Sequence, residues 1–279
     1  MAKSKQTETL SVLELQQGVI QFNVLGTSPL FYHRFAMKAW HELLLPSGRK
    51  TAADRAGSLK HNPLEEYRGS LYRHGTGHNG ATRLYFPGSA FGKAIRSAAL
   101  DLPGVNKSQI GRLSWVEEYN VDIWGIPTLS MMMVRNSDMA RTPDVRTRAT
   151  LPQWACTITV RYARPLLNDK QIGNLTAAAG QIIGIGDGRA EKRTFRFGSF
   201  ELVSERDKRF LSVKKTAGRA AQDKAIAEPS FFDDESAELF RWFYTEIERR
   251  TGQQSAPKKL KTKADKHMAK MNGEDAHAA

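Results

Sequence analysis

The chain has 279 residues, a net charge of +13 and a sequence pI near 9.9. Such an excess of positive charge repels itself unless an anionic partner neutralises it, which favours a nucleic-acid partner over a generally soluble basic protein. The single cysteine, Cys156, excludes an internal disulfide and indicates a reducing cytoplasm. Because no apolar run approaches the roughly 18 residues of a membrane span and no signal peptide is recognisable, we expect no membrane association.

The first half of the chain predicts a strand, a long irregular stretch, and a strand followed by a helix. Residues 18–26 alternate apolar and polar side chains, as a half-buried strand does. Residues 27–81 contain scattered glycines and one plausible helix, at residues 36–44, and resemble an insertion. Residues 82–86 predict a short strand, and after a Pro-Gly turn Ser89 is a candidate helix N-cap for residues 90–100.

The predicted helix 90–100 carries Lys93 and Arg96, which are three apart and therefore share a helical face. Further along, residues 135–152 show neither helical nor strand periodicity and are rich in arginine. We expect an exposed hairpin there, with Arg141, Arg146 and Arg148 reaching a neighbouring subunit or a nucleic-acid strand.

The second half predicts further regular elements. They are strands at residues 113–126, 128–134, 154–163 and 194–203, and helices at residues 168–183 and 233–250. Together with the first half they give the order strand, helix, strand, strand, helix, strand. That order predicts an α+β fold of the ferredoxin-like, RRM type, an antiparallel sheet with two helices on one face.

We expect residues 1–252 to form a single domain. Residues 253–279 hold six lysines and three acids, almost without aromatic or β-branched residues, and predict a disordered basic tail. Because this tail contributes only +3, most of the positive charge lies in the domain. The tail either binds phosphates weakly or simply keeps the protein soluble.

A glycine-rich segment lies between the predicted helix 168–183 and the last predicted strand. Gly184, Gly186 and Gly188 occupy every second position. Phosphate-binding loops of nucleotide sites lead from a strand into a helix, which is the reverse order, so a nucleotide site is not expected. We expect Gly184 or Gly186 to form a left-handed helix cap and the others to allow a turn.

Basic and aromatic side chains surround these glycines. Arg189, Lys192 and Arg193 crowd the segment and suit a phosphate backbone. Phe195 and Phe197 share one face of the predicted strand, where they either pack in the core, which we favour, or stack on bases.

Three stretches, residues 19–31, 84–100 and 177–202, resemble motifs of the repeat-associated mysterious protein (RAMP) superfamily. The chain is most similar to the guide-RNA-binding backbone subunits of CRISPR effector complexes. The resemblance implies an RRM-like palm with fingers at residues 27–81 and a thumb at residues 131–152. It further implies head-to-tail polymerisation along a guide RNA, within an antiviral ribonucleoprotein that holds other subunits.

In this resemblance the residues that face the RNA are on the first helix and the glycine segment. They are Lys93, Arg96, Arg189, Lys192 and Arg193. Family members that cut RNA use an acid in the loop after the first strand, but residues 26–40 contain neither Asp nor Glu. We therefore expect no catalytic residues and no cofactor.

Two alternatives remain for the function. One is a phage or mobile-element protein of the same fold that binds single-stranded DNA. The other is a divergent endoribonuclease in which His33 or His41 is the general acid–base.

A metal site is not expected from the sequence. His74 and His78 are four apart, a spacing that suits metal binding on a helix, but three glycines between residues 75 and 80 make a helix there improbable. With one cysteine and no neighbouring acid pair, the sequence predicts a mobile polar loop.

Overall fold

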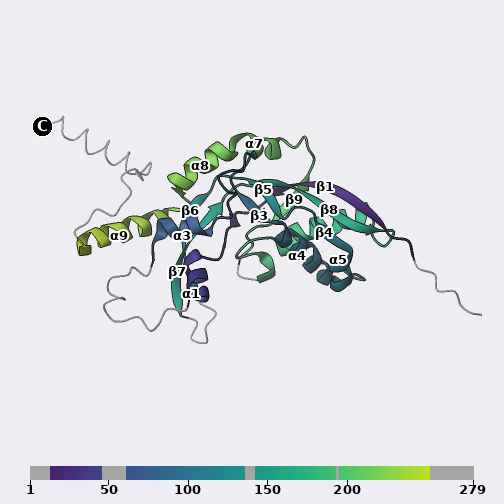
Figure 1. Ribbon diagram of the computed structural model, residues 1–279, viewed down its shortest axis with the longest axis horizontal. Helices are drawn as coiled ribbons and strands as arrows, with labels where there is room; N and C mark the ends of the chain where they lie inside the picture. Colours follow the sequence, from purple (N-terminus) through teal and green to yellow (C-terminus); the bar gives the residue numbers. More distant parts are fainter. Residues whose placement is uncertain (1–12, 46–60, 136–141, 193–194, 252–279) are drawn as a thin grey trace, which may run out of the picture.

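A six-stranded antiparallel sheet forms the centre of the computed structural model (Figure 1). The structure describes residues 13–45, 61–135, 142–192 and 195–251. Four strands run side by side in the order β5 (Asn120–Trp124), β8 (Ala155–Arg164), β1 (Gln16–Gly26) and β9 (Phe200–Val203). The short strands β3 (Tyr85–Pro87) and β4 (Ser114–Val116) pair with β5 and β8, respectively.

Two helices pack on one face of this sheet. They are α4 (Gly88–Ala98), which follows β3, and α6 (Asp169–Ala178), which follows β8. The chain order β1, α4, β5, β8, α6, β9, with β1 and β8 in the middle of the sheet, is the ferredoxin-like arrangement. The predicted α+β, RRM-type class is confirmed.

The sheet and its helices follow directly from local sequence. In β8 the side chains of Ile158, Val160 and Tyr162 alternate into the core and are completely buried. Helix α6 begins with a capping box between Asn168 and Gln171 and buries Ile172 and Leu175 on one face. Alternating burial along β8 and the capping box of α6 are local sequence signals, so the sequence predicts these two elements well.

A second, four-stranded sheet has the order β10 (Ser230–Phe231), β6 (Thr128–Arg135), β7 (Pro143–Leu151) and β2 (Leu30–Phe31). Strands β6 and β7 form an antiparallel hairpin whose pairing runs from Thr128↔Thr150 to Arg135↔Pro143. The hairpin expected from residues 131–152 is therefore present, although residues 135–152 showed no strand periodicity in the sequence. The inner half of β7 packs against α3 (Pro63–Ser70), and its last three residues are all buried. This half of the strand therefore does not alternate between buried and exposed residues.

Several further helices surround the two sheets. They are α1 (Met37–Leu44), α5 (Lys107–Leu113), α7 (Lys208–Thr216), α8 (Arg219–Ala227) and α9 (Asp234–Thr251). In Figure 1, α7 and α8 lie on the opposite side of the central sheet from α4 and α5. Phe210 and Val213 of α7 pack there against Leu25 and Ala155. No helix in the described ranges is long and apolar enough to cross a membrane.

Two predicted element boundaries are wrong. The expected strand 113–126 is divided into β4 and β5, because residues 117–119 leave the sheet before the chain returns to it. Within the expected strand 194–203 only Phe200–Val203 is strand, since Gly198 has φ +65° and interrupts the extended backbone. Within the stretch 27–81, which was expected to be an insertion, Tyr67 and Leu71 are completely buried in the main core.

One buried side chain, Gln222 of α8, joins three parts of the chain. Its carbonyl oxygen accepts from the backbone N–H groups of Arg83 and Leu84 at 2.7 and 3.1 Å. Its amide nitrogen lies 2.8 Å from the carbonyl oxygen of Ile123 and 3.1 Å from that of Gly125. Gln222 is completely buried, so water cannot replace these bonds.

We therefore expect Gln222→Ala to lower the free energy of unfolding by about 2–4 kcal/mol, because it leaves several buried backbone groups without partners. Equilibrium urea denaturation measures this change. The control is Lys224→Ala on the exposed face of the same helix, which should stay within about 0.5 kcal/mol of the unaltered protein. Equal stability of the two variants would contradict the assignment.

Candidate nucleic-acid interface

A cavity of about 320 Å³ lies between the start of α4, the glycine segment (residues 184–188) and the chain that follows β2. Its lining is part apolar and part charged. The polar and charged side chains are His33, Tyr72, Ser89, Lys93, Asp187, Arg189 and Glu191. Two of the residues that the sequence assigns to RNA binding, Lys93 and Arg189, therefore line one cavity although they are far apart in the chain.

The N-terminal turn of α4 forms one wall. The helix begins at Gly88 after Pro87, and no side chain caps it. Ser89, expected as the N-cap, instead lies inside the first turn and lines the cavity, because the helix starts two residues earlier than its sequence suggests. The N–H of Gly88 already donates to the carbonyl oxygen of Tyr119 at 2.9 Å, but the positive end of the helix dipole at this turn still favours an anion.

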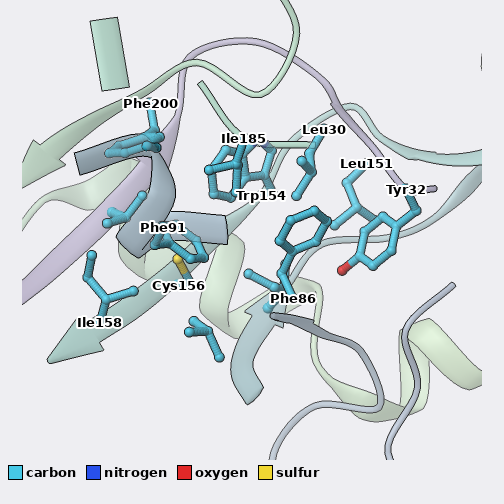
Figure 2. Close-up of a cluster of buried hydrophobic side chains, with 14 of the residues drawn as sticks. Leu30, Tyr32, Phe86, Phe91, Leu151, Trp154, Cys156, Ile158, Ile185 and Phe200 are labelled. Carbon is cyan, nitrogen blue, oxygen red and sulfur yellow. The ribbon is translucent and has the colours of Figure 1, made fainter. Parts of the chain in front are cut away.

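The glycine segment forms the opposite wall and is fixed by its backbone. Gly184 has φ +73° and caps the π-helical turn Ala179–Ile183, as the sequence predicted for Gly184 or Gly186. Gly186 has φ +79°, and a Cβ there would lie 2.7 Å from the carbonyl oxygen of Phe31. Ile185 is buried in the core cluster of Figure 2, together with Leu30 and Trp154.

The acids of the cavity are paired with arginines. Glu191 accepts a hydrogen bond from Arg189 at 2.9 Å, and Asp187 binds Arg148 of β7. Burial opposes ionisation of Glu191, but hydrogen bonds from Arg189 and Ser97 outweigh it and lower the pKa of that carboxyl. Glu191 is therefore charged at neutral pH. Both acids are paired with arginines, so they repel an anionic ligand less than unpaired acids would.

The hairpin arginines are not equivalent. The Arg148 side chain is only 12% exposed, which contradicts the expectation of an exposed residue; its pairing partner Asp187 comes from the distant glycine segment. Burial and the charge of Arg146 lower the pKa of Arg148 to about 10, so it stays protonated at neutral pH.

Partial desolvation, followed by the charges of Arg148 and Arg146, lowers the pKa of His33 to about 4, although its ring is exposed at the cavity.

The remaining predicted residues divide into three groups. Arg96 does not line the cavity, because its side chain packs over Gly111 of α5. Lys192 ends the short 3-10 helix Ala190–Lys192 and is exposed. Arg141 and Arg193 lie outside the described residues.

An aromatic stack lies directly beneath the glycine segment. The rings of Phe31 and Phe197 are stacked with centroids 4.3 Å apart, and Phe195 stacks on Phe197 at 4.9 Å. A Cβ on Gly188 would lie 2.7 Å from the Phe197 ring. Burial decreases outward along the stack, from Phe31, which is 1% exposed, to Phe195, which is 45% exposed. Phe195 is thus not the core residue that the sequence favoured.

Sequence reasoning missed the contributions of Tyr72, Ser89 and Asp187 to the cavity. Asp187 stands between two glycines next to the basic residues, and that position is the signal that could have identified it. Tyr72 carries no such signal, because its place depends on how residues 61–81 fold back onto the sheet.

No protein-family model matches the chain, and no curated protein matches its sequence. Among solved structures the chain is similar to the crystal structure of Cmr6 from Pyrococcus furiosus, with 10% sequence identity and a TM-score of 0.33. That match covers 67% of this chain and 98% of the other.

Proposed function

We propose that the protein is a non-catalytic subunit that binds single-stranded RNA and polymerises along it as part of a CRISPR-type ribonucleoprotein. The observation that carries the proposal is the meeting of the α4 N-terminus, Lys93 and Arg189 in one cavity. Each of these three features attracts an anion, and a phosphate group is the anion that a basic protein of this kind meets along a strand. The three sequence motifs that resemble the RAMP superfamily support the same proposed function.

The cavity suits a sugar–phosphate backbone rather than a small nucleotide. Its glycine wall has little side-chain bulk, so a strand can approach the backbone closely. Beside it, the exposed ring of Phe195 offers a surface on which any base can stack. Phosphate contacts and stacking together give binding that tolerates many sequences.

A binding role fits the cavity better than RNA cleavage. A general acid must hold a proton at working pH, but the pKa of His33 is lowered to about 4, so near pH 7 this residue can accept a proton but not donate one. His41 is exposed on α1 and does not line the cavity. Single-strand DNA binding by the same surface remains the alternative, since phosphate contacts alone do not distinguish the two polymers.

The double variant Lys93→Gln/Arg189→Gln should weaken binding of all single strands alike. We expect the slope of log K against log salt to fall by about 0.7 for each lost contact, about 1.4 in total, because fewer counterions are released. Fluorescence anisotropy with labelled oligomers at several salt concentrations measures both quantities.

The matched control is Lys215→Gln/Lys224→Gln, which removes the same charge from α7 and α8 outside the cavity. An equal loss in the control would show that only net charge matters and would overturn the proposed interface. Measurement with RNA and DNA oligomers of one sequence separates the two readings, because only an RNA site uses the 2′-hydroxyl. Preference for DNA would favour the phage or mobile-element alternative.

A second prediction concerns the aromatic stack. Phe195→Ala should cost about 1–3 kcal/mol of binding free energy if one base stacks there, whereas Phe195→Trp should retain binding. The control is Tyr119→Ala, which removes an aromatic ring that is 89% exposed and does not line the cavity. Oligomer titrations measure the effect, and unchanged affinity of Phe195→Ala would remove base stacking from the proposal.

We further propose that a second copy of the chain packs on α1. This helix and its flanks expose apolar side chains from 49% to 81%, a density that marks an interaction surface. They are Phe35, Met37, Trp40, Leu43, Leu44 and Leu45. Head-to-tail packing along a strand requires such a contact on every subunit, and a heterologous contact of this kind builds open helices.

Leu44→Asp should therefore prevent assembly on a long strand but not binding of a short one. Light scattering with a long single strand should show a growing assembly for the unaltered protein and isolated bound subunits for the variant. Leu211→Asp, which alters a 49% exposed leucine on α7, is the control and should assemble normally. If Leu44→Asp assembles normally but is less stable, the surface is covered by its own chain instead.

A further inference from the structure

Three potential metal ligands, from two distant parts of the chain, meet at the edge of the central sheet. They are His74 and His78, in the turn before β3, and Asp122 of β5. One ligand atom from each lies within 4.8 Å of the other two. The sequence predicted no metal site because it offered no helix and no neighbouring acid. The fold supplies the acid from 48 positions away, and a turn in place of a helix brings the histidines together.

The geometry within the group is close. Nε2 of His74 lies 2.8 Å from Oδ1 of Asp122. The two imidazole rings are stacked with centroids 3.9 Å apart and an interplanar angle of 17°. Nε2 of His78 is buried without a hydrogen-bond partner, and a side chain at Gly80 would collide with this ring. A buried polar atom without a partner calls for a physical explanation, and an ion is one of the few available.

Backbone contacts hold the turn in place. The N–H of His74 donates to the carbonyl oxygen of Arg83 at 3.0 Å, and the N–H of His78 donates to that of Gly75 at 3.1 Å. Arg83 donates to the carbonyl oxygen of Gly75 at 3.0 Å, and Arg219 donates to that of His78. The histidines are therefore positioned before any ligand binds, which reduces the entropy lost on binding.

The positive charges of Arg83 and Arg219 would repel a cation at this site, but a nearby carboxylate reduces that repulsion. Asp223 lies 3.5 Å from Arg83 and 3.8 Å from Arg219, measured between charged atoms. The negative charge of this carboxylate partly neutralises both guanidinium groups. The guanidinium groups bind carbonyl oxygens and this acid, so they do not occupy the ligand atoms of the histidines.

We propose that His74, His78 and Asp122 bind a divalent transition-metal ion of the Zn²⁺ class. Two imidazole nitrogens and one carboxylate oxygen form a zinc ligand set with a fourth position for water. Zinc–ligand distances of about 2.0–2.2 Å place tetrahedral ligand atoms about 3.3 Å apart, so small side-chain rotations close the site. The ion joins the turn 74–80 to β5 and stabilises this edge of the sheet, independently of nucleic-acid binding.

The test is titration of the full chain with Zn²⁺ by calorimetry, and with Co²⁺, whose visible absorption reports ligand geometry. We expect one ion per chain in this site and a higher melting temperature with Zn²⁺. His78→Ala and Asp122→Asn should each weaken binding more than about tenfold. Asp122→Asn keeps a group that can hydrogen bond to His74, so circular dichroism should show an unchanged fold.

His41→Ala is the matched control, because it removes an exposed histidine of α1 and should leave the titration unchanged. Because His267 and His277 could also attract Zn²⁺, all variants are made in a chain in which both are alanine. Absence of binding in this chain would overturn the proposal. Equal binding by His78→Ala, by folded Asp122→Asn and by the unaltered site would overturn it as well.

Discussion

The close backbone contact between the glycine segment and residues 29–31 is the constraint on which the site depends. Gly186 has φ +79° and lies against Leu30 and Phe31, where a larger residue would collide. The N–H of Asp187 donates to the carbonyl oxygen of Phe31 at 3.2 Å, and Ile185 is inserted into the core. Core contacts therefore hold the backbone of this wall in place, and this fixes the position from which the charged residues after it extend.

This fixed wall explains how the charges of the cavity are arranged. A nearly buried arginine such as Arg148 is costly unless a carboxylate compensates it, and Asp187 can do so only because the glycine segment holds it against β7. The same pairing joins the β6–β7 hairpin to the glycine segment. Arg189 in turn is restrained by Glu191 and by the carbonyl oxygen of Gly186, while Lys93 extends from the rigid helix α4. The cations are thus positioned before a ligand arrives, which favours binding.

The helices on the far face explain why the candidate site lies at the loops. RRM domains bind RNA on the sheet face that the two helices leave open. Here Phe210 and Val213 of α7 cover part of that face by packing on Leu25 and Ala155. The cavity that we propose as the binding site lies instead where α4 begins and the glycine segment turns. The fold is therefore of the RRM type, whereas the surface used for binding in our proposal is not.

The sequence alone determined the elements whose signals are local. Alternation in β1 and β8 and the Asn168 capping box fix their elements within a few residues. The sequence likewise singled out Gly184, Gly186 and Lys93, which line the candidate cavity. The tertiary structure alone decided what depends on distant neighbours. It paired Arg148 with Asp187, turned Arg96 toward α5 and divided the strand expected at residues 113–126. It also brought Asp122 to His74, because a side chain's partners are set by which strands lie side by side, and no local pattern records that pairing.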